Sequence, residues 1–150
     1  MRKLVIANRG AGGIGKSSAI KAVYWLIKKD MGIEPDVEVW QGDDIMAVFD
    51  INDVKIGISS QGDPGSCMKE NMELFEDKFE CGIIVTACRM KGDTYHKVTD
   101  YLGEKKHYDI IWYGHYVYQV SGAEEIQEIF NQRYAEQVVK LVEERIAGTF

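Results

Sequence analysis

The residues with the clearest chemical meaning lie in the stretch GAGGIGKS, residues 10–17. Gly10, four residues, and then Gly15, Lys16 and Ser17 fill every fixed position of the pattern G-x-x-x-x-G-K-[ST]. Glycines let backbone N–H groups turn inward around a phosphate chain. Lys16 could reach the terminal phosphates, and Ser17 could ligate magnesium from the start of a helix whose dipole favours negative charge. The stretch predicts a bound nucleoside triphosphate and Mg²⁺; the alternative is a glycine-rich turn that binds nothing. The residues predicted to bind the nucleotide are Gly10, Gly12, Gly13, Ile14, Gly15, Lys16, Ser17 and Ser18.

Charged residues that follow other predicted strands could act together with this stretch. Asp43 and Asp44 follow the strand 37–41, and either could bind magnesium or take a proton from an acceptor hydroxyl, or lie in a solvated turn. Asp63 could orient a water or an acceptor, or could form a turn and cap the next helix. Arg89 could stabilise the charge on a transferred phosphoryl group, or could be a solvated loop residue. The predicted catalytic residues are Lys16, Asp63 and Arg89, and the predicted metal ligands are Ser17, Asp43 and Asp44.

These residues need a scaffold, and the sequence predicts one in which strands alternate with helices. Several strands are apolar throughout, which is typical of strands buried on both faces of a parallel sheet. The alternation predicts an α/β fold with a mainly parallel sheet, one β-hairpin and helices on both faces. Ligands of such sheets bind at the carboxyl ends of the strands. The expected strands cover residues 4–7, 37–41, 45–50, 54–59, 82–87 and 108–113, with 45–50 and 54–59 forming the hairpin and 108–113 a further buried strand. The expected helices run from residue 16 to about 31, over 67–79, over about 93–102 and from about 121 to 146.

Length, composition and charge limit the classes of function. The chain of 150 residues, 45% of them hydrophobic, predicts a single domain over residues 1–150. Its 18 basic and 24 acidic residues give a net charge of −6, which argues against a broad nucleic-acid surface. No apolar run approaches the roughly 18 residues of a membrane span, so we expect no membrane contact and a cytoplasmic location. The three cysteines lack metal-binding spacing and are predicted to be reduced, mostly buried thiols.

Residues 10–17, with the strand before them and the helix after them, resemble the P-loop NTPase and kinase superfamily. This resemblance implies a P-loop NTPase-like three-layer sandwich. The stretch IGISSQGDPG is similar in layout to the switch region of small GTPases, with Ser59 at the position of the strand-end Asp and Gly62 at that of the Gly. The stretch TACRMKGD does not reproduce the Asn-Lys-x-Asp that reads guanine, so ATP is the expected nucleotide. Trp112 or Tyr116 could stack on adenine, or could belong to the core or an interface.

Two functions follow from these observations. The first is a small kinase-like phosphotransferase that uses ATP and Mg²⁺ to modify an unidentified small acceptor. The alternative is a slow ATPase switch that binds a protein partner through the hairpin and the loop after it, as both become ordered around the terminal phosphate. The Ser59 found where the strand-end Asp would be does not decide between them, because a kinase can take magnesium ligands from elsewhere and a switch can hydrolyse ATP slowly.

Overall fold

A computed structural model of the protein describes residues 1–10, 16–114 and 123–150. It confirms an α/β fold with a six-stranded, mostly parallel sheet. Three of the helices continue or end as π-helical segments, labelled η. The elements in chain order are β1 (Leu4–Arg9), α1 (Lys16–Trp25), η1 (Leu26–Asp30), β2 (Val37–Gln41), β3 (Asp44–Ile51), β4 (Val54–Ser59), α2 (Met68–Glu73), η2 (Leu74–Lys78), β5 (Ile83–Cys88), α3 (Asp93–His96), η3 (Lys97–Lys105), β6 (Asp109–Gly114) and α4 (Ala123–Ile146).

The strands lie in the order β2-β3-β4-β5-β1-β6. Strands β4, β5, β1 and β6 are parallel, and β3 is antiparallel to both β2 and β4. The predicted hairpin is therefore confirmed as β3 and β4, and its turn at Asn52 and Asp53 uses two residues with positive φ. Because β3 runs against its neighbours, its first residue, Asp44, lies at the edge where the parallel strands end.

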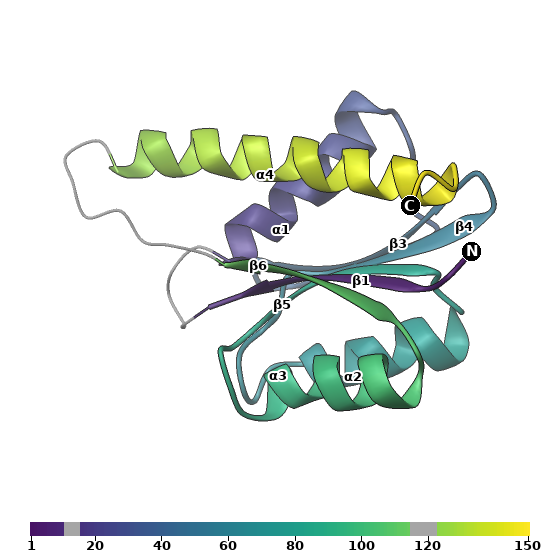
Figure 1. The fold of residues 1–150 in the computed structure, drawn as a ribbon. Helices are drawn as coiled ribbons and strands as arrows, with labels where there is room; N and C mark the ends of the chain where they lie inside the picture. The colour runs from purple at the N-terminus through teal and green to yellow at the C-terminus, as the bar shows by residue number, and fades with distance from the viewer. Residues whose placement is uncertain (11–15, 115–122) are drawn as a thin grey trace.

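Two apolar clusters cover the two faces of the sheet, with α1 and α4 on one face and α2 and α3 on the other (Figure 1). Successive side chains of a strand point to opposite faces. In β1, Leu4 and Ile6 pack into the cluster under α1 and α4, whereas Val5 and Ala7 pack into the cluster that contains α2. This two-sided burial explains why the central strands are apolar without alternation.

The prediction of a buried strand at 108–113 is wrong in one respect. Strand β6 forms, but it lies at the edge of the sheet and its residues are half-buried or exposed. Its apolar residues still contribute to both clusters, since Ile110 packs against one and Ile111 against the other. An apolar run thus indicates a strand with two covered faces, but it does not indicate whether the strand is hydrogen-bonded to neighbours along both of its edges.

Helix α4 packs across α1 (Figure 1). The apolar side chains of α4 are buried over only part of its length. Val138 and Val142 are buried, whereas Ile129 and Phe130 are 58% and 47% exposed. Of the helices in the described ranges, none combines the length and the apolar character that crossing a membrane would require.

Candidate functional site

Side chains from the starts of α1 and β3, from the loop after β4 and from the end of β5 meet at the edge where β1, β4 and β5 end. They line a pocket of about 310 Å³. The pocket is formed by residues at the start of α1, at the start of β3 and in the loop after β4. Its lining residues are Lys16, Ser17, Asp43, Asp44, Ser60, Gln61, Gly62, Asp63, Ser66 and Ala87.

Lys16, the first residue of α1, has its ammonium group fixed at the centre of this edge. The side chain is only 5% exposed, and Nζ donates hydrogen bonds to the carbonyl oxygens of Gly10 (2.8 Å) and Cys88 (3.1 Å). Burial lowers the pKa of Lys16, and the nearby carboxylate of Asp63 opposes that shift. The lysine therefore presents a desolvated positive charge beside the ends of β1 and β5, where an anion would be strongly attracted.

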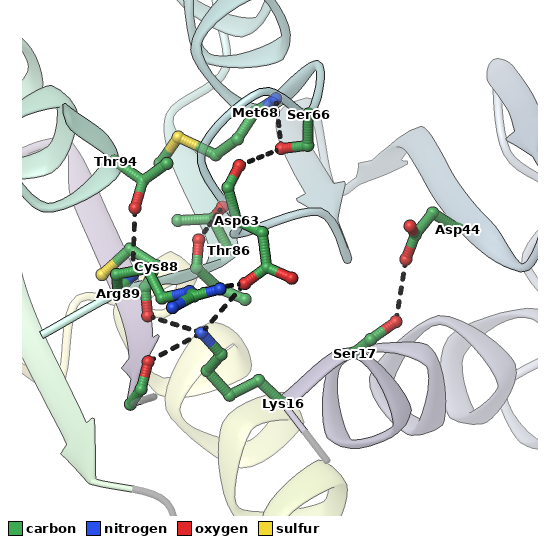
Figure 2. Close-up of polar contacts among 12 residues, drawn as sticks. Lys16, Ser17, Asp44, Asp63, Ser66, Met68, Thr86, Cys88, Arg89 and Thr94 are labelled. Atoms are coloured by element: carbon green, nitrogen blue, oxygen red, sulfur yellow. Dashed lines mark hydrogen bonds and ion pairs between the residues drawn. The ribbon is translucent and has the colours of Figure 1, made fainter. Parts of the chain in front are cut away.

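Asp63 and Arg89 join Lys16 in one charged cluster (Figure 2). Arg89 Nε donates to Asp63 Oδ1 at 2.8 Å, and that oxygen lies 3.7 Å from Lys16 Nζ. The hydrogen bond from Arg89 is the main reason why the pKa of Asp63 is lowered. The three residues predicted to be catalytic thus lie in contact, although up to 73 positions separate them in the sequence.

The alternative role of Asp63 as a helix cap is not what the structure shows. The residue before α2 is Cys67, and no side chain caps the helix at that position. Ser66 is nearer to that role, because its hydroxyl accepts a hydrogen bond from the Met68 N–H at 3.3 Å. The side chain of Asp63, 54% exposed, is instead directed at the two cations.

Ser17 and Asp44, two of the predicted metal ligands, contact each other directly (Figure 2). Ser17 Oγ donates to Asp44 Oδ1 at 2.8 Å, and Ser60 Oγ donates to the same oxygen at 2.9 Å. Ser60 also accepts a hydrogen bond from the Ile45 N–H at 2.9 Å, which ties the loop after β4 to the start of β3. Hydroxyl and carboxylate oxygens are the ligands that Mg²⁺ prefers, so this pair fits such an ion.

Asp43, the third predicted metal ligand, is exposed on the rim of the same pocket. It precedes β3, so it could approach an ion in the pocket, but Asp44 is the carboxylate that the structure places against Ser17. Ser18, predicted to bind nucleotide, is exposed and lines a different hollow beside Lys21 and Trp25. Residues 11–15, including Gly12, Gly13, Ile14 and Gly15, lie outside the described residues.

Ser59 does not reach the pocket, although it occupies the strand-end position that resembles the switch region of small GTPases. Its side chain is fully buried, and its Oγ accepts a hydrogen bond from Asn71 Nδ2 at 3.1 Å. Ser60, one residue later, supplies the hydroxyl that contacts Asp44. The sequence analysis missed Ser60, and the two-residue alternation of a strand is the signal that separates it from Ser59.

A stack of aromatic rings and an arginine was also missed. Arg9, the last residue of β1, places its guanidinium carbon 5.2 Å from the ring centre of Tyr95 and 5.3 Å from that of Trp112. The two rings stack with centres 5.4 Å apart, and Trp112 remains 36% exposed. Tyr116, the alternative base-stacking residue, lies outside the described residues.

The cysteine nearest the charged cluster, Cys88, is buried. Burial raises the pKa of the Cys88 thiol to about 11, so it stays protonated at neutral pH. All three cysteines are free, and Cys81 and Cys88 are buried, as the sequence predicts. Among the described residues there is no cluster of three or more His, Cys, Asp or Glu side chains that could hold a metal ion.

Gly62 sets the position of the loop that carries Asp63. A Cβ atom on Gly62 would lie 2.6 Å from the carbonyl carbon of Ala87 and 2.7 Å from its Cβ. We therefore expect Gly62→Ala to push this loop away from β5 and to cost about 1–3 kcal/mol of folding free energy, as overpacking does. Thermal unfolding should show a melting temperature about 2 to 10 °C lower.

Pro64→Ala is the matched control for this prediction, because Pro64 is exposed in the same loop. Its melting temperature should stay close to that of the parent protein. Equal melting temperatures for the Gly62→Ala variant and the parent would show that the loop does not rest on β5 as described.

Comparisons of this chain with models of protein families, with curated proteins and with solved structures find no match.

Proposed function

We propose that the protein is a P-loop NTPase-like, ATP- and Mg²⁺-binding phosphotransferase that acts on a small acceptor. The observation that carries this proposal is the convergence of Lys16, Ser17 and Asp44 with the Asp63–Arg89 pair at one edge of the sheet. A buried cation, a hydroxyl beside a carboxylate, and a second cation are the groups that phosphoryl transfer requires. The arrangement of helices on both faces of a mostly parallel sheet is compatible with the three-layer sandwich of that superfamily.

Each group has a role that its surroundings support. Lys16, already desolvated, would hold the terminal phosphate, and Ser17 with Asp44 would hold Mg²⁺. ATP would supply the phosphoryl group, whose bond to the leaving oxygen breaks as a bond to the acceptor oxygen forms. Arg89 is placed to balance the negative charge that spreads over the phosphoryl oxygens. Asp63, kept ionised by Arg89, could accept the proton that the acceptor hydroxyl loses.

A slow ATPase switch is the second candidate, and the position of Asp63 favours it. Asp63 lies in the loop after β4, and its carboxylate pairs with Arg89 and approaches Lys16. A phosphate arriving at Lys16 would compete with that carboxylate for the same cations, so the loop would respond to nucleotide. A partner protein that binds this loop could therefore distinguish the nucleotide-bound state from the nucleotide-free state.

One labelling experiment tests the proposal and separates the two functions. The parent protein is incubated with Mg²⁺ and ATP labelled at the terminal phosphate, with and without a pool of small metabolites or a protein fraction. We expect label in an organic product when the small-molecule pool is present, and none with Lys16→Ala. Release of label only as inorganic phosphate, stimulated by the protein fraction, would favour the switch. No consumption of ATP under any of these conditions would refute the phosphotransferase.

ATP should bind more tightly than GTP. The sequence lacks the Asn-Lys-x-Asp that reads guanine, and Trp112 offers a partly exposed ring at the edge where β6 ends. Stacking on such a ring does not depend on the identity of the base, so it gives GTP no advantage. A competition titration against a fluorescent ATP analogue measures the preference, and GTP binding several-fold more tightly would reverse it.

A further inference from the structure

A second pocket lies directly beside the one that holds Lys16 and Ser17. Its volume is about 320 Å³, which is at the lower end of the roughly 300–1,000 Å³ typical of small-molecule sites. It shares two lining residues, Asp44 and Gln61, with the first pocket. The other lining residues come from β2, β3, α2 and their flanks: Val39, Gln41, Met46, Cys67, Glu70, Asn71 and Leu74.

The two residues that line both pockets, Asp44 and Gln61, are held in place by hydrogen bonds. Gln61 Nε2 donates to Gln41 Oε1 at 3.0 Å, and Gln61 Oε1 accepts from the Cys67 N–H at 2.8 Å. Asp44 is held on its other side by Ser17 and Ser60. A ligand in the second pocket would therefore lie beside the proposed phosphate and metal site, and its reactive group would have to extend past Asp44 and Gln61 to reach the phosphoryl group.

The two pockets differ in whether a cation accompanies their carboxylates. The first is lined by Asp43, Asp44 and Asp63 but also contains Lys16, and Arg89 pairs with Asp63 beside it, so a phosphate there would meet two cations. The second is lined by two carboxylates, Asp44 and Glu70, and no lysine or arginine is among the described residues that line it. An anion there would meet like charges without a compensating cation, and such juxtaposition is strongly unfavourable.

The rest of the second pocket combines apolar surface with amides. Val39, Met46 and Leu74 offer apolar contact, and the amides of Gln41 and Gln61 offer both donors and acceptors. Such a lining suits a compact apolar body that carries a hydroxyl or an amine.

We propose that this second pocket binds the acceptor, and that the acceptor is a small neutral or cationic molecule with an apolar body and a hydroxyl or amine group. This inference rests on the proposed phosphotransferase function, because it assigns the substrate class of the same site. It excludes acceptors that already carry a phosphate or a carboxylate. Asp44 and Gln61, which line both pockets, then mark where the hydroxyl or amine of the acceptor would enter the first pocket and approach the phosphoryl group and Asp63.

Fragment binding measured by ligand-observed NMR tests the proposal on the full chain. The probes are three compounds with one cyclohexane body and one hydroxymethyl group, whose second substituent is an aminomethyl, a hydroxymethyl or a carboxylate group. A fragment library balanced among cationic, neutral and anionic hydroxyl compounds extends this series. Each is measured with and without Mg²⁺ and a non-hydrolysable ATP analogue, so that loss of nucleotide binding, which would refute the proposed function, is seen separately.

Two variants locate the binding. Met46→Trp fills the pocket, and Met31→Trp is its matched control, a half-buried methionine outside the pocket's lining residues. Glu70→Lys reverses an exposed charge in the pocket lining without changing the core, and Glu104→Lys is the control on another helix.

We expect cationic and neutral probes to bind at least about fivefold more tightly than anionic ones, and Met46→Trp but not Met31→Trp to abolish this binding. Glu70→Lys should shift the preference toward the anionic members. Because the Glu70 side chain is exposed, that variant remains informative if Met46→Trp fails to fold. Equal or tighter binding of anionic probes by the parent protein, binding that neither pocket variant alters, or no binding of any probe would each overturn the proposal.

Discussion

Replacing Lys16 with alanine is expected to weaken ATP binding by about 10- to 100-fold and to remove turnover. The reason is that its ammonium group is the buried cation of the site, and hydrogen bonds to charged groups contribute about 1.5–3 kcal/mol. Among the described residues, Nζ donates to the carbonyl oxygens of Gly10 and Cys88 and lies 3.7 Å from Asp63 Oδ1. Lys16 belongs to neither apolar cluster, so we expect the variant to keep the core. Titration calorimetry with ATP and Mg²⁺ measures the change in affinity.

Lys21→Ala is the matched control for this prediction, because Lys21 belongs to the same helix but does not line the candidate pocket. Its affinity for ATP should stay close to that of the parent. Circular dichroism should show a folded Lys16→Ala protein. A folded Lys16→Ala protein that binds ATP as tightly as the parent would remove the lysine from the proposed site.

Replacing Asp44 with asparagine should raise the Mg²⁺ concentration required for half-maximal ATP binding by about tenfold, or ~1.4 kcal/mol. Asparagine keeps an oxygen that can accept from Ser17 and Ser60 but removes the negative charge. The melting temperature should change little, because asparagine can still accept both hydrogen bonds. Magnesium titrations at fixed ATP concentration, followed by nucleotide binding or turnover, measure the effect.

Asp43→Asn and Asp63→Asn are the control variants, which show whether the change in the magnesium requirement is specific to Asp44. Asp43 is exposed on the rim and Asp63 is paired with Arg89, so we expect both to alter the magnesium requirement less than Asp44→Asn does. An unchanged magnesium requirement in all three variants would mean that no carboxylate holds the ion, leaving Ser17, phosphate and water as its ligands.

Much of the scaffold could be predicted because local patterns report burial directly. The apolar runs of β1 and β5 predict strands that are covered on both faces, and both are central in the sheet. The rule that ligands bind where parallel strands end led to Asp63 and Arg89, which the structure brings into contact with each other and close to Lys16.

Strand order and lateral position are not encoded in the same local patterns. β5 lies between β4 and β1, and β6 lies at an edge, because pairing between distant segments decides these positions. An edge strand and a central strand can have the same apolar run when both have two covered faces.

The finer features of the site depend on tertiary geometry. Whether Ser59 or Ser60 reaches Asp44 depends on where the alternation of β4 ends and the next loop begins. The packing of Arg9 against Tyr95 and Trp112 depends on three segments that are far apart in the sequence. The alternation could have separated Ser60 from Ser59, but the stack around Arg9 has no spacing signature, so the sequence indicated single candidate residues and not their contacts.

A crystal structure of the parent protein with Mg²⁺ and a non-hydrolysable ATP analogue tests the central proposal most directly. We expect the terminal phosphate within hydrogen-bonding distance of Lys16 Nζ, and the ion against Ser17 Oγ with Asp44 beside it or bridged to it by water. Asp63 should then have lost its approach to Lys16, because the phosphate takes that position. A nucleotide bound elsewhere on the chain, or phosphates that touch neither Lys16 nor Ser17, would contradict the proposal.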